Sequence, residues 1–307
     1  MAVACGQGGK GAQGVDSPGS IRMFPTVTPP TMMQDQQEIL QFMVMHFWDA
    51  FIEPAEGTRC DSLHIAGVEA GEVEQNLASY IDLLDMMPMP QARKAVAALA
   101  DKAEANEAAD TSSNIFEKFA SLTEKYLFDP NSPLRNEDYF QAYAERLSLS
   151  PRLDAATKDR YAYIAATSRI NAVGTKAADF VFSDKNGRER NLYGIKADHI
   201  LLFFSNPGCD ACMEIINGLR NDAKVNQMIK DGALAVLNIY IDEDLQAWRD
   251  YMEIYPQTWY NGFDPYLAIR NDLLYNVRAI PSLYLLDSDK IVILKDAVPE
   301  KLSAILN

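Results

Sequence analysis

The sequence has few cysteines, little positive charge and no long apolar run, and each shortage excludes a class of protein. Four cysteines in 307 residues are too few for a disulfide-dense secreted scaffold. A net charge of −15 leaves no basic stripe for a phosphate backbone, so we expect no nucleic-acid partner. No stretch approaches the roughly 20 apolar residues that a membrane-spanning helix needs. The hydrophobic fraction of 48% is ordinary for a globular protein, and the length suggests two domains.

The N-terminus is predicted to be a flexible linker over residues 1–30. Its first twenty residues contain six glycines, and Pro25, Pro29 and Pro30 follow. Small residues precede Cys5 and a polar stretch comes after it, which resembles the end of a bacterial lipoprotein signal whose apolar core is missing. Two interpretations stay open: Cys5 is acylated after removal of an upstream signal, or it is an incidental cysteine in a disordered tail.

Residues 31–172 are predicted to form an all-helical domain. Apolar residues recur at helical spacing from about residue 35 to residue 170. The predicted helices cover approximately 35–51, 69–86, 90–107, 112–128, 136–147 and 154–170. Proline-containing segments such as 129–133 separate them. Methionines are frequent here, which fits either core filling or an adaptable binding surface. We expect this domain to position another module or to recognise its client.

Residues 173–307 are predicted to form an α/β domain. The runs 200–204 and 233–241 are continuously apolar, as in strands buried on both faces. A hairpin is expected over 180–193 around Asn186-Gly187, and a second one over 282–294. Helices are predicted over 209–230, 245–254, 266–275 and 298–306.

The chemistry is expected at the turn between the first buried strand and the helix after it. Cys209 and Cys212 are three residues apart on the first helical turn, so their sulfurs face the same way and can form a disulfide. The positive end of the helix dipole favours the thiolate of Cys209, and the thiolate is the attacking species. Cys212 lies one turn deeper. We therefore predict that Cys209 attacks a target disulfide and that Cys212 resolves the mixed disulfide.

A CxxC pair can instead be half of a zinc site. Cys60 and His64 would have to complete it, but nothing in the sequence brings them to the pair. We therefore predict no metal, and interpret Cys60 as a buried small hydrophobe and His46 as a core histidine.

A second signal is Pro281, which directly precedes the apolar run 282–286. Proline removes a hydrogen-bond donor from a sheet, but it is tolerated at the first residue of a strand. A cis bond between Ile280 and Pro281 would make a tight corner there.

With these motifs, residues 174–307 resemble the thioredoxin superfamily, and in particular the TlpA-like thiol–disulfide oxidoreductases of bacterial cell envelopes. Further matching residues are Asp179-Phe180, Gly187, Leu192, Asp242 and Trp248. The helical half resembles a domain of unknown function that precedes such modules in envelope lipoproteins. The resemblance implies a thioredoxin-like domain with a central mixed sheet flanked by helices, preceded by the all-α domain.

The resemblance also implies a substrate site and a cellular setting. Pro281 is expected to be cis and to face the CxxC motif, the backbone of Ile280 to pair with a bound client strand, and Pro207 and Gly208 to line the site. No cofactor is expected beyond the Cys209–Cys212 disulfide. The expected partners are client proteins with disulfides and an upstream thiol electron donor. The expected location is the periplasm of a Gram-negative bacterium, with membrane contact only through a lipid on Cys5.

The sequence departs from the family pattern at four positions. Gly208 replaces the usual aromatic before the first cysteine, Phe203 replaces the buried aspartate of thioredoxin, Ile215 replaces an acid, and Asn217 replaces a proline. The proton acceptor for the second thiol therefore stays open between Glu214, Asp242 and water.

Asp210, between the two thiols, is predicted to tune the redox potential. Its negative charge opposes the helix dipole and should raise the pKa of Cys209. A less stable thiolate means a less stable dithiol and a more negative potential, which favours a reductase. The alternative is a non-catalytic thioredoxin-fold adaptor that binds client proteins, and the changes at Gly208 and Phe203 keep it open.

Overall fold

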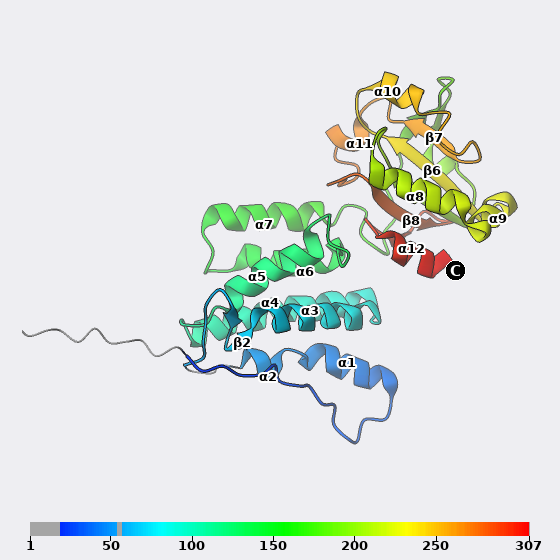
Figure 1. The fold of residues 1–307 in the computed structure, drawn as a ribbon. Helices are drawn as coiled ribbons and strands as arrows, with labels where there is room; N and C mark the ends of the chain where they lie inside the picture. Colours follow the sequence, from blue (N-terminus) through cyan, green and yellow to red (C-terminus); the bar gives the residue numbers. More distant parts are fainter. Residues whose placement is uncertain (1–18, 54–56, 307) are drawn as a thin grey trace, which may run out of the picture.

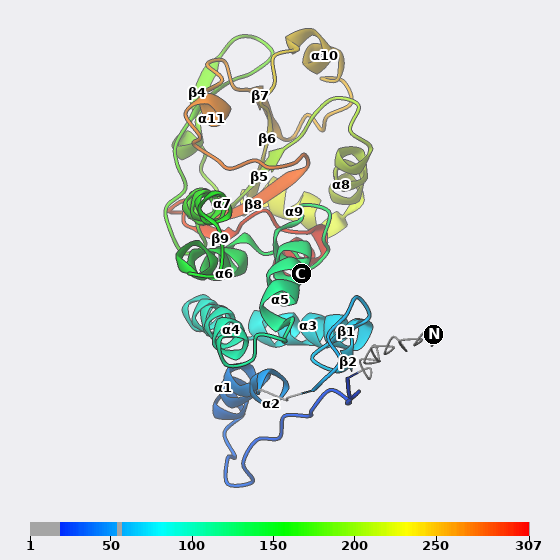
Figure 2. The ribbon, with the colours of Figure 1, turned by 90° about the vertical axis from the view of Figure 1, so that its left-hand side faces the viewer.

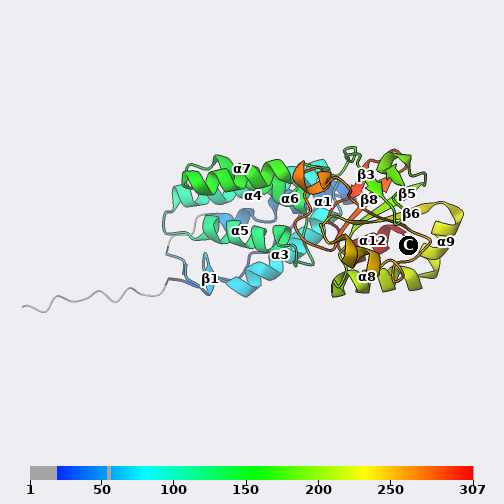
Figure 3. The same ribbon diagram turned by 90° about the horizontal axis from the view of Figure 1, so that it is seen from above.

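The computed structural model describes residues 19–53 and 57–306, which form a helical domain followed by an α/β domain (Figure 1). Cys5 lies outside these residues, so its acylation stays a prediction. None of the described helices combines the length and apolar character needed to cross a membrane. Seen from above, the two domains lie end to end (Figure 3).

The helical domain is confirmed, with one addition. Its elements are α1 (Gln36–His46), α2 (Asp49–Ile52), β1 (His64–Ile65), β2 (Val68–Glu69), α3 (Ala70–Asp85), α4 (Met89–Ala109), α5 (Ile115–Thr123), the π-helix η1 (Glu124–Phe128), α6 (Glu137–Leu149) and α7 (Ala155–Thr167). The addition is the short hairpin β1–β2, whose strands have two residues each. The prediction of an all-helical domain did not include it. Its turn places Ala66 and Gly67 in the left-handed region, at φ 45° and 82°.

Aromatic rings and small side chains hold the helical domain together. Trp48 makes edge contacts with Phe119 at 4.8 Å and with Tyr80 at 5.7 Å between ring centroids. The central helix α4 buries alanines, including Ala92 and Ala103, against its neighbours. Small side chains let the neighbouring helices α5 and α6 approach α4 closely.

The α/β domain contains a seven-stranded mixed sheet in the order β4-β3-β7-β6-β5-β8-β9. Its elements are β3 (Val181–Ser183), β4 (Glu189–Asn191), η2 (Leu192–Gly194), β5 (His199–Phe204), α8 (Asp210–Asn221), α9 (Ala223–Asp231), β6 (Leu234–Tyr240), α10 (Leu245–Asp250), β7 (Tyr260–Phe263), α11 (Ala268–Asn271), β8 (Ser282–Asp287), β9 (Val292–Leu294) and α12 (Pro299–Leu306). Strand β5 runs parallel to β6 and antiparallel to β8.

Strand β5 separates two hydrophobic cores. Ile200, Leu202 and Phe204 point into one, together with residues of α11. Leu201 and Phe203 point into the other, which is covered by α8, α9, α10 and α12. Successive strand side chains alternate between the faces of a sheet, so a continuous apolar run fits a strand with a core on each side.

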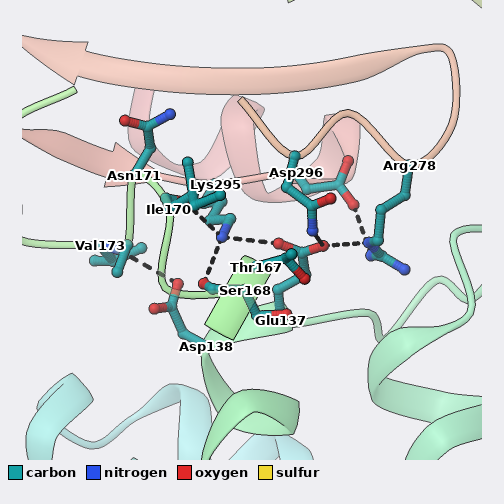
Figure 4. Close-up of polar contacts among 12 residues, drawn as sticks. Glu137, Asp138, Thr167, Ser168, Ile170, Asn171, Val173, Arg278, Lys295 and Asp296 are labelled. Atoms are coloured by element: carbon teal, nitrogen blue, oxygen red, sulfur yellow. Dashed lines mark hydrogen bonds and ion pairs between the residues drawn. The ribbon is translucent and has the colours of Figure 1, made fainter. Parts of the chain in front are cut away.

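The two domains are joined by buried charged groups (Figure 4). Lys295, directly after β9, donates to the carbonyl oxygens of Ser168 at 2.6 Å and Ile170 at 2.9 Å, both at the end of the helical domain. Its Nζ also lies 2.8 Å from Oε2 of Glu137, the first residue of α6, and both side chains are 1% exposed. Figure 2 shows α6 directly below β9. Buried charges require this degree of pairing, so the contact fixes one domain on the other.

Three predictions for the α/β domain were wrong in detail. The helix expected over 209–230 is broken at Asp222, and the helix over 266–275 is reduced to the four residues of α11. Leu267 and Leu273, which flank α11, have φ of 53° and 51°, outside the helical region. Strand β7 was not predicted, because its sequence Tyr-Asn-Gly-Phe carries little apolar alternation.

Asp222 offers a stability test. Its carboxylate accepts hydrogen bonds from the backbone N–H groups of Lys224 at 2.8 Å and Val225 at 3.0 Å, which caps α9. We expect Asp222→Ala to lower the free energy of unfolding by about 1 kcal/mol, as for other N-caps. Urea denaturation measures the loss. Asp222→Asn is the matched control, since asparagine caps equally well, and equal losses in both variants would contradict the capping role.

Candidate functional site

The two cysteines lie at the junction of β5 and α8. Strand β5 ends at Phe204, four residues follow, and Cys209 is the N-cap of α8. The sulfurs of Cys209 and Cys212 are bonded, with the Cα atoms 5.2 Å apart. Cys209 is partly exposed and Cys212 is 1% exposed. The backbone N–H of Cys212 donates to Sγ of Cys209 at 3.1 Å. A hydrogen bond of this kind stabilises negative charge on the outer sulfur.

Strand register brings Pro281 to the same edge of the sheet. Ser282 of β8 pairs with Phe204, the last residue of β5, so Pro281 lies just beyond the point where the chain turns toward the cysteines. The Ile280–Pro281 peptide bond is cis, and both residues are partly exposed. Pro207 is also partly exposed and Gly208 is exposed. Register therefore places these four residues at one edge of the sheet, in the loops that leave β5 and enter β8.

Tyr251 lies beside the predicted site, and the sequence did not indicate this. Gly208 has φ +74°, and a Cβ atom built there would lie 3.9 Å from the hydroxyl of Tyr251, the C-cap of α10. An aromatic side chain thus lies close to the position before Cys209, although the sequence has glycine at that position. Its separation of 43 residues from Gly208 left no local signal.

The two predicted proton acceptors lie in different settings. Glu214 is exposed on α8. Asp242 follows β6 and accepts a hydrogen bond from Nδ2 of Asn206 at 2.6 Å, in the loop before the cysteines. It also forms an ion pair with Arg270 of α11. Asp242 therefore fastens the cysteine loop to α11, and its role as a proton acceptor stays a prediction, as does that of Glu214.

A network of uncharged polar side chains lies on the same face of the sheet as Phe203. The buried hydroxyl of Ser205 donates to Oδ1 of Asn238, whose Nδ2 donates to Oδ1 of Asn261 at 3.2 Å. Tyr255 is buried on the same face, and burial raises its pKa to about 12. Its phenol therefore stays protonated at neutral pH and is a poor base.

The residues of the zinc alternative lie in two different domains. Cys60 and His64 belong to the helical domain, where Nδ1 of His64 lies 3.0 Å from Asp61. Within residues 19–53 and 57–306, no group of three or more His, Cys, Asp or Glu side chains is arranged to hold a metal ion. Two structural expectations were also wrong: Cys60 is only partly buried, and His46 is exposed and paired with Asp49 at 2.6 Å.

Comparisons with known proteins cover both halves of the chain. A family described as a domain of unknown function (DUF5106) matches residues 5–171. No curated protein matches the chain. A thioredoxin-like protein from Bacteroides caccae is 35% identical, with a TM-score of 0.78, and the match covers 94% of this chain and 99% of that one.

Other solved structures match less than half of this chain. The C-terminal domain of an uncharacterized protein from Bacteroides fragilis is 43% identical over 44% of this chain and 97% of that one, with a TM-score of 0.43. The thioredoxin domain of a thiol-disulfide oxidoreductase from Bacteroides vulgatus is 19% identical over 44% of this chain and 99% of that one, with a TM-score of 0.39. From the DUF5106 match and the near full-length likeness to the Bacteroides caccae protein, the chain belongs to the DUF5106 family and carries that domain in front of a thioredoxin-like domain.

Proposed function

We propose that the protein is a thiol–disulfide oxidoreductase that reduces disulfides in client proteins. The observation that carries this proposal is the asymmetry of the two thiols. Cys209 is reachable at the start of α8 and its sulfur accepts a backbone hydrogen bond, whereas Cys212 is buried one turn deeper. Such an arrangement suits one sulfur for attack and the other for resolution.

The reaction begins from the reduced protein. The thiolate of Cys209 attacks a client disulfide, so that a Cys209–client S–S bond forms and the client S–S bond breaks. One client sulfur leaves as a thiolate and takes up a proton. Cys212 then gives up its proton and attacks the sulfur of Cys209, which releases the second client thiol and leaves the Cys209–Cys212 disulfide. An upstream dithiol donor supplies the two electrons that reduce this disulfide again. No other redox group is required.

The client is proposed to bind along the start of β8. The backbone of Ile280 would pair with an extended client strand, and Pro281, Pro207 and Gly208 would form the surface beside the outer sulfur. Main-chain pairing at a strand end gives affinity with little dependence on sequence, which suits a reductase with several clients. The proton of Cys212 would pass to Glu214, Asp242 or water.

The proposed setting is the cell envelope. A reductase of protein disulfides needs clients that form disulfides, and such proteins are found in oxidising compartments such as the periplasm. Acylation of Cys5 would hold the protein at a membrane surface by its lipid alone.

A trapping experiment tests the attack and resolution roles. Cys212→Ser removes the resolving sulfur, so clients should remain bound to Cys209 as mixed disulfides. They are detected as adducts on non-reducing gels that disappear with dithiothreitol. Cys209→Ser is the matched control and should trap far less. If neither variant traps clients in an envelope extract, and the wild-type disulfide resists dithiothreitol, the non-catalytic adaptor is the better description.

The charge of Asp210 provides a second test. Asp210→Asn removes a negative charge beside the outer sulfur, which stabilises its thiolate and therefore the reduced form. The interaction of a charge with an exposed helix end is worth about 0.3–1 kcal/mol, which corresponds to a rise of roughly 6–20 mV in the midpoint potential. Equilibration with glutathione measures it. Asp222→Asn, at the other end of α8, is the control and should leave the potential unchanged. A downward shift in Asp210→Asn would contradict the proposed tuning.

A further inference from the structure

The loop that leads into Pro281 is held from outside its own domain. Arg278 is three residues before Pro281, and its side chain is 12% exposed. Its guanidinium forms an ion pair with Glu137 of α6 and donates to the carbonyl oxygen of Phe128 at the end of η1. It also lies over the ring of Phe128, 4.1 Å from the centroid. Three separate contacts from one side chain therefore reach the helical domain.

The same guanidinium is also tied to its own domain. Nη2 of Arg278 lies 3.0 Å from Oδ2 of Asp296, and Oδ1 of Asp296 accepts a hydrogen bond from Ser282 at 2.9 Å. Ser282 is the first residue of β8 and follows Pro281 directly. Figure 4 shows Arg278 beside Glu137 and Asp296. The contacts of Arg278 thus fix the loop before Pro281, and those of Asp296 fix the residue after it.

No helix or strand includes this loop, so side-chain contacts hold it in place. Residues 272–281 lie between α11 and β8. The earlier part is held by Asn171 of the helical domain, whose Nδ2 donates to the carbonyl oxygen of Leu274 at 2.8 Å. Between Leu274 and Ser282, the side chain of Arg278 forms ion pairs with both domains, with Glu137 of the helical domain and with Asp296 of its own domain. Glu137 is itself held in place, because its other carboxylate oxygen lies 2.8 Å from Nζ of Lys295 and its side chain is 1% exposed.

We propose that Glu137 and Phe128 of the helical domain position the client-binding loop: by holding Arg278 they fix the backbone of Ile280 for pairing with a client strand. Arg278 and Glu137 are positioning residues in this scheme and do not touch the reacting sulfurs. The inference rests on the proposed function, because it assumes that a client pairs at Ile280. It gives the DUF5106 domain a specific task, which is to order the binding loop of the neighbouring redox domain in advance of the client.

Preorganisation predicts a selective defect. A loosened loop must be ordered again when a client strand binds, so affinity for protein disulfides falls. A small aromatic disulfide needs no strand pairing and should react with Cys209 as before. A general loss of folding would lower both reactions together.

Arg278→Met is the principal variant. It keeps an apolar stem against Phe128. Glu137 remains paired with Lys295, and Asp296 still has Arg135 at 3.6 Å, so neither buried carboxylate is left without a cation. Arg278→Lys should show an intermediate defect. An ammonium group can pair with one partner, but it cannot reproduce the several fixed N–H donors with which a guanidinium binds partners in both domains. Glu137→Gln is the second variant, from the helical side. Lys301→Gln is the matched control, since it breaks another ion pair between the domains, to Asp85 at 2.8 Å, far from the loop in sequence.

Two measurements on the full chain test the proposal. Hydrogen exchange should become faster at residues 276–282 in Arg278→Met and Glu137→Gln, with the amides of α8 unchanged and Lys301→Gln like wild type. Steady-state reduction of insulin with dithiothreitol as donor should show KM raised about tenfold in Arg278→Met, a loss of about 1.4 kcal/mol in binding. Its single-turnover reaction with dithiobis(nitrobenzoate) should keep the wild-type rate.

The outcomes separate this proposal from the proposed function. Unchanged exchange in the loop of both variants, or equal losses with insulin and the small disulfide, would overturn the positioning role while leaving the reductase intact. A wild-type protein that reduces no insulin would overturn the proposed function and with it the client-binding role. Faster exchange together with a selective rise in KM supports both.

Discussion

The arrangement of this protein depends on a buried set of charges between its two domains. Glu137 comes from the helical domain, and Arg278, Lys295 and Asp296 come from the thioredoxin-like domain. A carboxylate that is 1% exposed is tolerated only when its charge is compensated, and here both cations come from the other domain. Burial raises the pKa of Asp296 even though Arg278 and Arg135 oppose the shift. If the domains separated, these buried charged groups would lose their partners and would have to be solvated or paired again. The ion pairs therefore hold the two domains together next to the candidate site.

This constraint connects the sheet edge to the helical domain. The register of β5 with β8 places Pro281 beside the loop that enters α8, and the helix start holds the outer sulfur. Both loops at this edge are also fastened by side chains: Asn206 to Asp242 before the cysteines, and Arg278 to Glu137 before Pro281. The thiols and the proposed client strand thus meet where anchored loops adjoin, which limits the reorganisation that binding requires.

Local sequence patterns predicted most of the helices and strands. They could not predict the contacts between residues that are far apart in the sequence. The apolar run ending at Phe204 and the CxxC spacing identify a buried strand followed by a helix, because both signals lie within a few residues. Asp222 also carries a local signal, since aspartate is a preferred N-cap, but the apolar spacing on both sides favoured one long helix. The pairing of Arg278 with Glu137 joins residues 141 positions apart, and Tyr251 approaches Gly208 from another helix. Only the folded chain brings these residues together, so their roles follow from geometry alone.

The replacement of an acid by Phe203 has a structural consequence on the same face of the sheet. Around Phe203 the core is apolar, and the polar groups beside it, Ser205 and Asn238, are neutral and satisfy each other. A carboxylate at this depth would need a partner of its own, and the amide and hydroxyl avoid that cost. Negative charge is instead held near the rim, at Asp242, where an arginine and an asparagine share it. Cys212 belongs to the same hydrophobic core as Phe203, so in the proposed reaction its proton must leave this core toward Glu214, Asp242 or water.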